Sequence, residues 1–179
     1  LRQKNPLETP VLCLFDNEEI GSSTAQGAMS TLLPDVLRRI CLEQGLGETD
    51  YLRLLAGSMM VSADNAHGVH PNHPEKAALT NRPKLGEGVV VKYGTGYATT
   101  GASAGLLLEM LRRKNVPVQS YFNHSDVAGG STLGALSVTQ VSVRTVDIGL
   151  AQLAMHSAFE TAGVKDTEAL AQLAEHLFV

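Results

Sequence analysis

Short apolar runs alternate with longer stretches in which apolar residues recur at helical spacing, and this alternation limits the possible folds most strongly. The short runs are too short for buried helices and predict strands at 11–15, 58–62, 88–93, 116–122 and 143–148. The stretches between and after them predict helices at 34–44, 49–56, 102–114, 131–140, 157–163 and 167–178. Strands that alternate with helices are typical of α/β proteins, so we expect a mixed central sheet flanked by helices.

The composition fits one globular domain over residues 1–179, because 44% of the residues are hydrophobic and 18% are charged. No apolar run approaches the roughly 20 residues that span a bilayer. The net charge is −4 and the basic residues are scattered, so we expect neither a nucleic-acid nor a membrane partner. Two cysteines form no disulfide framework and no apolar leader begins the sequence, which together favour a cytoplasmic location.

An acidic cluster follows the first predicted strand, where Asp16, Glu18 and Glu19 place three carboxylates in four positions. Such carboxylates repel one another unless water or a cation neutralises them. Asp64 and the polar segment 123–126 also follow predicted strands, and ligands of α/β sheets bind in loops of this kind. The alternatives are a solvated acidic turn at 16–19 and a turn-forming or capping role for Asp64.

His67, His70 and His73 recur at every third position, which raises the alternative of a zinc site in the loop. Pro71 and Pro74 interrupt any helix that would align these imidazoles, so the segment is not a helical zinc motif. Histidines that support an active site or a turn fit the segment better than a three-histidine metal site.

Three further segments leave a functional and a structural interpretation open. Residues 94–96 with Gly101 approach a dinucleotide fingerprint, but the third glycine comes two positions late. Segment 126–134 is either a turn that binds an anion or a carbonyl oxygen, or a plain capped turn. His156 lies in an apolar segment, where a histidine is usually a hydrogen-bonded core residue unless carboxylates approach it.

Several blocks of this sequence, taken together and in order, resemble the aspartyl aminopeptidase family. They are Asp16–Ser22, Ala25–Ala28, Ser62–His67, His70–Asn72, Gly129–Thr132, Val146–Gly149 and Gln152–Ser157. The resemblance extends over almost the whole chain. It implies a zinc-aminopeptidase-like α/β fold, of which the chain is the C-terminal portion of the catalytic domain, with an incomplete sheet.

The resemblance also implies roles for the acidic cluster and its partners. Glu18 is expected to be the general base, and Glu19, Asp64 and His156 are expected to be metal ligands. Two divalent ions would be bound, zinc first and manganese or cobalt as alternatives, because carboxylate and imidazole suit all three. The ions would polarise the scissile carbonyl and lower the pKa of a bridging water, from which Glu18 takes a proton.

Other residues are expected on the substrate side of the site. Those that line it are His67, Gly129, Gly130, Ser131 and Thr132. Lys92 is a candidate partner for an acidic substrate side chain, with a surface lysine as the alternative. The segment 94–96 is shortened relative to the family, and Thr100 stands where the family often has Asp.

The expected function is a metal-dependent aminopeptidase that releases N-terminal, acidic residues from peptides, working as a homo-oligomer. A related peptidase with neutral specificity is one alternative. The other is a catalytically incomplete fragment or assembly module, because the family also uses an N-terminal His, a bridging Asp and an oligomerisation domain upstream of this segment. An incomplete sheet leaves an unpaired edge, so we expect the chain to oligomerise, bind the missing half or dissolve poorly.

Overall fold

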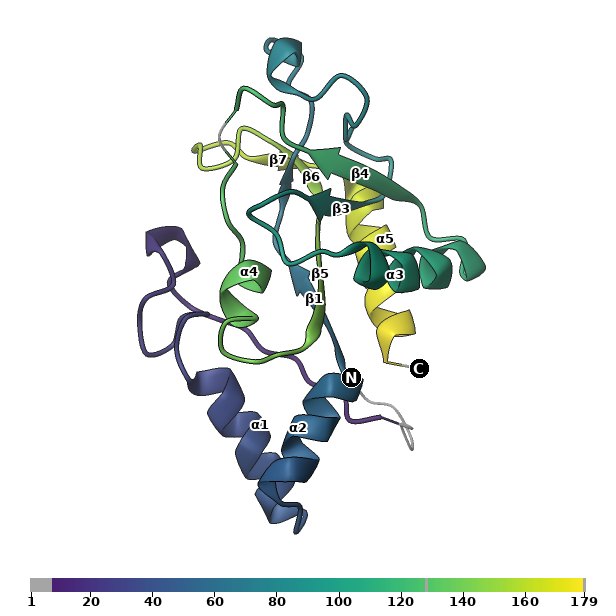
Figure 1. Cartoon of the computed structure of the whole chain (residues 1–179). Coiled ribbons are helices and arrows are strands. Elements are labelled where there is room, and N and C mark those ends of the chain that lie inside the picture. The colour runs from purple at the N-terminus through teal and green to yellow at the C-terminus, as the bar shows by residue number, and fades with distance from the viewer. Residues whose placement is uncertain (1–7, 128, 179) are drawn as a thin grey trace.

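The computed structural model describes residues 8–127 and 129–178, and its centre is a four-stranded sheet (Figure 1). In spatial order the strands are β1 (Met59–Ala63), β5 (Arg144–Gly149), β3 (Val89–Tyr93) and β4 (Val118–Phe122). β1 is parallel to β5 and β3 is parallel to β4, whereas β3 and β5 are antiparallel. The predicted mixed sheet is therefore confirmed, as are four of its five predicted strands.

Alternate residues of the central strands face opposite layers of the molecule. Val89 and Val91 of β3, with Val146 and Ile148 of β5, pack against α3 (Gly101–Arg113) and α5 (Val164–Leu177). These two helices lie on the same side of the sheet in Figure 1. Residues on the other face, Val90 among them, meet a different layer that includes Ala66 and Ala151. The period of two along each strand thus separates an apolar face from the face that holds the candidate site.

A smaller sheet stands at one end of the first. It contains β2 (Ala66–His67), β6 (Ala151–Leu153) and β7 (Thr161–Ala162) in the order β2-β6-β7. The helix predicted at 157–163 is wrong, because this segment folds back so that β7 pairs antiparallel with β6. Just before this segment, φ angles of 55° at Ala154 and 69° at His156 turn the chain. These positive values do not occur within an α-helix.

Two helices form a hairpin at the opposite end of the molecule (Figure 1), α1 (Leu32–Glu43) and α2 (Glu48–Gly57). Cys41, Tyr51 and Leu55 form the small core between them. The short α4 (Leu133–Ser137) packs on β1 and β5, and two single-turn helices, η1 (Glu18–Ile20) and η2 (Pro74–Lys76), lie in loops. Among the described residues, no helix combines the length and apolar character needed to cross a membrane.

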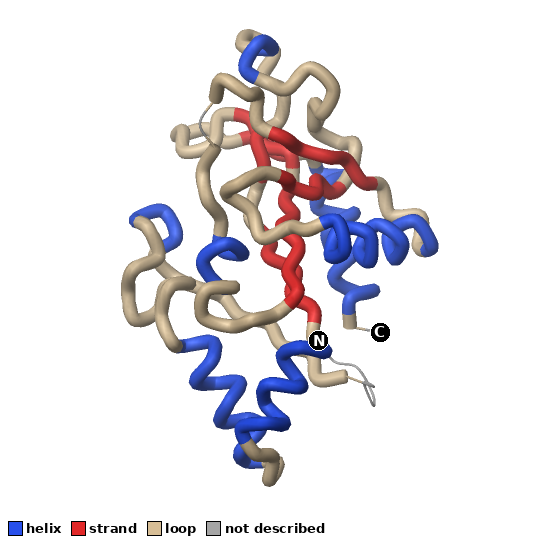
Figure 2. Tube along the Cα trace, in the orientation of Figure 1, coloured by secondary structure: helices blue, strands red, loops and turns tan. Residues whose placement is uncertain are grey.

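The strand predicted at 11–15 is wrong. Figure 2 shows this segment as a loop, with Leu12 62% exposed and Leu14 83% exposed. A strand requires a neighbour that pairs with its backbone, and this segment pairs with none of the strands that the structure describes. Its apolar pattern is therefore present without the burial that the pattern predicts.

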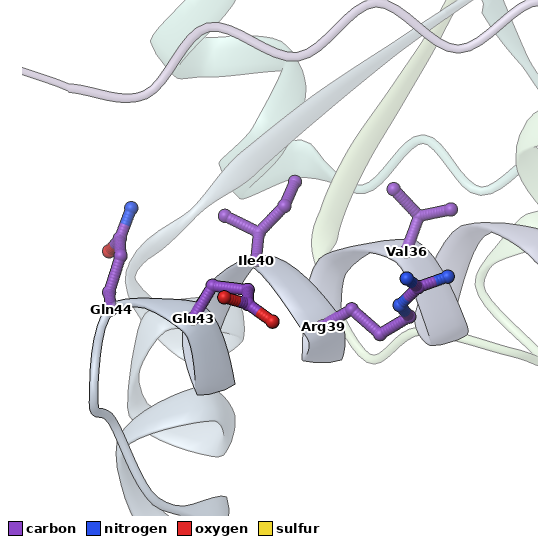
Figure 3. Close-up of a pocket in the computed structure, with 5 residues that line it drawn as sticks. All are labelled: Val36, Arg39, Ile40, Glu43 and Gln44. Carbon is purple, nitrogen blue, oxygen red and sulfur yellow. The ribbon is translucent and has the colours of Figure 1, made fainter.

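The outer face of α1 is also apolar and open. A shallow pocket of about 390 Å³ lies there, lined by Val36, Arg39, Ile40, Glu43 and Gln44 (Figure 3). Four of these residues belong to α1 and Gln44 is its C-cap residue, so the pocket lies along one exposed helix face and not in a cleft between elements. It lies in the helical hairpin, away from the acidic cluster.

Candidate metal centre and substrate site

A tight turn presents Glu18 and Glu19 side by side. Asn17 adopts a left-handed conformation with φ of 62°, and Gly21 closes η1 with φ of 98°. The Thr24 hydroxyl donates to Asn17 Oδ1 at 2.9 Å and holds the turn. Asparagine and glycine adopt positive φ more readily than other residues, so the Asn17–Gly21 sequence itself favours this turn.

His156 meets Glu19 although the two residues lie near opposite ends of the sequence. His156 Nε2 is 2.9 Å from Glu19 Oε2, and the two side chains are 66% and 71% exposed. The backbone N–H of His156 donates to Glu160 Oε1 at 2.5 Å, which fixes the turn after β6. The interpretation of His156 as a core residue is therefore wrong, and the carboxylate that the functional interpretation requires is present.

Lys92 is buried beside Asp64. Its side chain is only 1% exposed, and Nζ lies 2.9 Å from Asp64 O, 3.2 Å from Asn65 O and 3.4 Å from Asp64 Oδ2. An ammonium group has three N–H donors, so these contacts use all of them. Burial lowers the pKa of Lys92, while the carboxylates of Asp64 and Asp147 act in the opposite direction. The surface-lysine alternative is therefore wrong.

Electrostatic interactions join these groups into one cluster. The pKa of Glu18 is raised, first by burial and then by Asp64 and Glu19, while His156 and Lys92 act against the increase. The pKa of His67 is lowered by burial first, and then by His156 and Lys92. Glu18, Glu19, Asp64, His67, Lys92 and His156 thus form one group of mutually interacting charges.

The donor types in this cluster fit zinc, but their arrangement fits it only in part. Carboxylate and imidazole are zinc ligands, and Glu19 and His156 already lie close enough to share an ion. Within residues 8–127 and 129–178, no group of three or more His, Cys, Asp or Glu side chains is placed to hold a metal. Two residues therefore suit a zinc ion directly, and Asp64 is engaged by Lys92 instead.

The turn at Gly129–Thr132 packs against the loop that follows β3. The Thr132 hydroxyl donates to Asp147 Oδ1 at 2.8 Å, and a Cβ at Gly96 would overlap the carbonyl of Gly130. In the same loop, the Tyr97 ring lies 5.3 Å from Lys92 Nζ. The turn thus neighbours the residues around Lys92, and its contact with substrate stays a prediction.

The other histidines and the segment 123–126 have local partners. The rings of His70 and His73 are 5.8 Å apart, and His73 Nδ1 is 3.2 Å from Glu75 Oε1. His124 Nδ1 is 3.9 Å from Asp126 Oδ2. β4, which precedes this segment, runs antiparallel to β1, which precedes Asp64, so the two strands lead into their loops in opposite directions. The three-histidine loop site gains no support, because His67, His70 and His73 are among the described residues, in which no three such side chains are placed to hold a metal.

Sequence reasoning missed two residues close to the cluster, Asp147 and Tyr97. Asp147 is fully buried in β5 and accepts hydrogen bonds from the Ala98 N–H and the Thr132 hydroxyl. The available signal was a charged residue inside an otherwise apolar strand, the same signal that Lys92 gives after three valines. Burial raises the pKa of Tyr97 strongly, with Tyr121, Asp147 and Asp64 adding to the increase.

A mixed α/β sheet that brings carboxylates and a histidine together in the loops after its strands is typical of metal-dependent hydrolases. Residues 2–178 match the family described as "Aminopeptidase I zinc metalloprotease (M18)", and the chain belongs to this family. The resemblance found in the sequence is thereby confirmed.

Individual relatives agree with this assignment. The chain is 46% identical over 160 residues to the "Probable M18 family aminopeptidase 2" of Clostridium novyi, covering 88% of this chain and 37% of that protein. The M18 aminopeptidase of Thermotoga maritima superposes with a TM-score of 0.84 at 27% identity, covering 92% of this chain and 38% of that one. The S. cerevisiae mApe1 dodecamer superposes with a TM-score of 0.78 at 32% identity, covering 92% of this chain and 36% of that one. The zinc-aminopeptidase-like fold is confirmed, and the chain spans little more than a third of these relatives' lengths.

Proposed function

We propose that this chain supplies metal ligands and the general base of a zinc aminopeptidase that removes N-terminal residues from peptides. The observation that supports this most directly is the 2.9 Å approach of His156 to Glu19, beside Glu18. A histidine and two carboxylates from separate segments, in a member of a zinc metalloprotease family, are the donors that such a centre needs.

Glu19 and His156 would hold zinc, and Asp64 would join them if it gave up part of its contact with Lys92. The proposal includes a second ion, with manganese or cobalt as alternative metals. Bound zinc supplies a Lewis acid for the scissile carbonyl.

Glu18 is suited to proton transfer because it lies in the cluster without being a ligand in this proposal. Burial and the neighbouring carboxylates Asp64 and Glu19 raise its pKa, which makes its carboxylate a stronger base than a solvated one. Glu18 would take a proton from the attacking water and later donate it to the leaving amine.

The preference for acidic N-terminal residues is supported by the family resemblance and by the cation at Lys92. Because the three donors of Lys92 already contact Asp64 and Asn65, a substrate carboxylate would have to replace one of these contacts. His67 and the turn at Gly129–Thr132 are the neighbouring candidates for substrate contact. A homo-oligomer is part of the proposal, supported by the dodecameric yeast structure.

One observation favours a second candidate, a non-catalytic fragment or assembly module. No third metal-ligating side chain joins Glu19 and His156 in the described residues. The number of metal ions bound per chain separates the candidates: two ions support the catalytic centre, while one or none supports the module.

The direct test is hydrolysis of chromogenic substrates with N-terminal Asp, Glu or Leu by the chain loaded with zinc, manganese or cobalt. We expect the acidic substrates to be preferred, and Glu18→Gln to lower kcat by about 10²- to 10⁴-fold at unchanged metal content. A preference for Leu would support neutral specificity. A folded, metal-loaded chain without hydrolysis would contradict the catalytic proposal and leave the assembly module.

A further inference from the structure

Asp147 is fully buried in the middle of β5, and both of its carboxylate oxygens have a partner from another segment. The Ala98 N–H donates to Oδ2 at 2.5 Å, and the Thr132 hydroxyl donates to Oδ1 at 2.8 Å. The backbone N–H of Asp147 donates to Thr99 Oγ1 at 2.8 Å. One residue thus joins a strand to a loop and to a turn.

The sheet register places this carboxylate beside Lys92. β3 and β5 are antiparallel with Val91 opposite Ile148, and this register, continued by one residue, places Lys92 opposite Asp147. Residues opposite each other in a sheet project from the same face. Asp147 is accordingly one of the groups that favour the charged form of Lys92.

Glycines leave room for these contacts. A Cβ at Gly134, in α4, would overlap both oxygens of Asp147, and a Cβ at Gly96 would overlap the carbonyl of Gly130. The Asp147 carboxylate therefore sits where α4, the loop at 96–99 and the turn at 129–132 meet. A side chain buried this deeply with two donors keeps those segments in a single arrangement.

We propose that Asp147 is a positioning residue of the peptidase site. By holding Tyr97–Thr99 and Gly129–Thr132 against β5, it fixes the wall of the site beside Lys92, whose Nζ lies 5.3 Å from the Tyr97 ring. This inference rests on the proposed function. Because Glu18 belongs to a separate turn, loss of Asp147 acts on substrate binding more than on proton transfer.

Two substitutions separate the hydrogen bonds of Asp147 from its charge. In Asp147→Asn the amide oxygen can accept from the Ala98 N–H while the amide nitrogen donates to the Thr132 hydroxyl, which rotates to accept. This variant keeps both links and loses the charge. Asp147→Val introduces an apolar side chain that is favoured in strands, and it leaves both donors without a partner.

The experiment measures kcat and KM of the zinc-loaded protein on N-terminal Asp peptides. For Asp147→Val we expect KM to rise about tenfold or more with a smaller change in kcat, because a displaced wall weakens binding. For Asp147→Asn we expect KM to stay within about threefold of wild type. Equal KM in wild type and Asp147→Val, or equal losses in both variants, would overturn the proposal.

A second readout does not depend on activity. Protein labelled with 3-fluorotyrosine gives a fluorine resonance for Tyr97, assigned with Tyr97→Phe. The resonance should shift or broaden in Asp147→Val and stay in place in Asp147→Asn. If Asp147→Val does not fold, Gly134→Ala displaces the same carboxylate and should give the same KM and resonance changes. An inactive wild type refutes the proposed function, while an unmoved Tyr97 resonance refutes the role of Asp147.

Discussion

At the scale of single residues, the cluster is organised by Lys92, a lysine that is 1% exposed and holds the backbone and carboxylate of Asp64. Gly149 makes this approach possible, because a Cβ there would overlap the Asp64 carbonyl that Lys92 binds. The lysine therefore fixes the start of the loop after β1, where one of the proposed metal ligands lies.

Replacing Lys92 tests this structural role. Lys92→Met leaves the Asp64 carboxylate and two carbonyl oxygens without their donor, so we expect the free energy of unfolding to fall by about 2–4 kcal/mol. The matched control is Lys84→Met, because Lys84 is exposed and pairs with Glu87 at 3.5 Å. Its loss should stay below about 0.5 kcal/mol in the same denaturant titration. Equal losses in the two variants would contradict the assignment.

His67 allows a prediction about pH. Partial desolvation, His156 and Lys92 lower its pKa in the folded chain from the ordinary 6.5, against the effect of Asp64, so protonation favours the unfolded chain. The contribution of His67 to stability is therefore complete above about pH 6.5 and decreases as the pH falls below that value. NMR titration of the metal-free chain should place the His67 midpoint below 6.5. His67→Gln should reduce the loss of stability between pH 7 and pH 5, and a midpoint at or above 6.5 would refute this.

Which site residues could be predicted from the sequence depended on the kind of signal. The roles of Glu18, Glu19 and His156 came from the family resemblance, because spacing alone left each a structural alternative. The contact between Glu19 and His156 requires the folded chain, since no local pattern connects residues so far apart. Lys92 and Asp147 gave a local signal, a charge within an apolar strand. The partners of both side chains lie in loops and turns that only the folded chain brings to them.

At the scale of elements, helices and central strands were predictable because their apolar periodicity coincides with their burial. The predictions at 11–15 and 157–163 failed because the outcome there depends on partners. The first segment has the composition of a strand and lacks a paired neighbour among the described strands. The second is turned by positive φ angles at Ala154 and His156 so that β7 pairs with β6.

Two glycines in helices should respond oppositely to alanine. Gly134→Ala in α4 places a methyl group on the Asp147 carboxylate, and we expect a loss of about 1–3 kcal/mol in unfolding free energy. Gly105→Ala in α3 enters open space, where alanine's helix propensity should stabilise the fold by about 0.5–1 kcal/mol. Thermal unfolding of both variants measures the difference. A Gly134→Ala chain as stable as wild type would show that α4 does not pack on Asp147 as described.

At the scale of the whole molecule, apolar side chains gather where little covers them. Leu12 and Leu14 are exposed in the loop before η1, and Val36 and Ile40 are exposed on α1. The chain spans 37% of its Clostridium novyi relative. That residues 1–179 form one domain stays a prediction.

We expect the purified chain to self-associate through this apolar surface. Light scattering should show species larger than a monomer. Their fraction should fall in the double variant Leu12→Ser with Leu14→Ser, because the substitutions remove exposed apolar area. Val164→Ser, at an exposed apolar residue near the start of α5, should leave association unchanged. A clean monomer at high concentration would refute the expectation.

The proposal that Glu19 and His156 hold zinc is tested by a calorimetric zinc titration of the chain. Glu19→Gln and His156→Gln should each weaken zinc binding by at least about tenfold, while His70→Gln and His73→Gln should bind as wild type does. Wild-type zinc binding by Glu19→Gln and His156→Gln, or loss of zinc binding in His70→Gln or His73→Gln, would contradict these ligand roles.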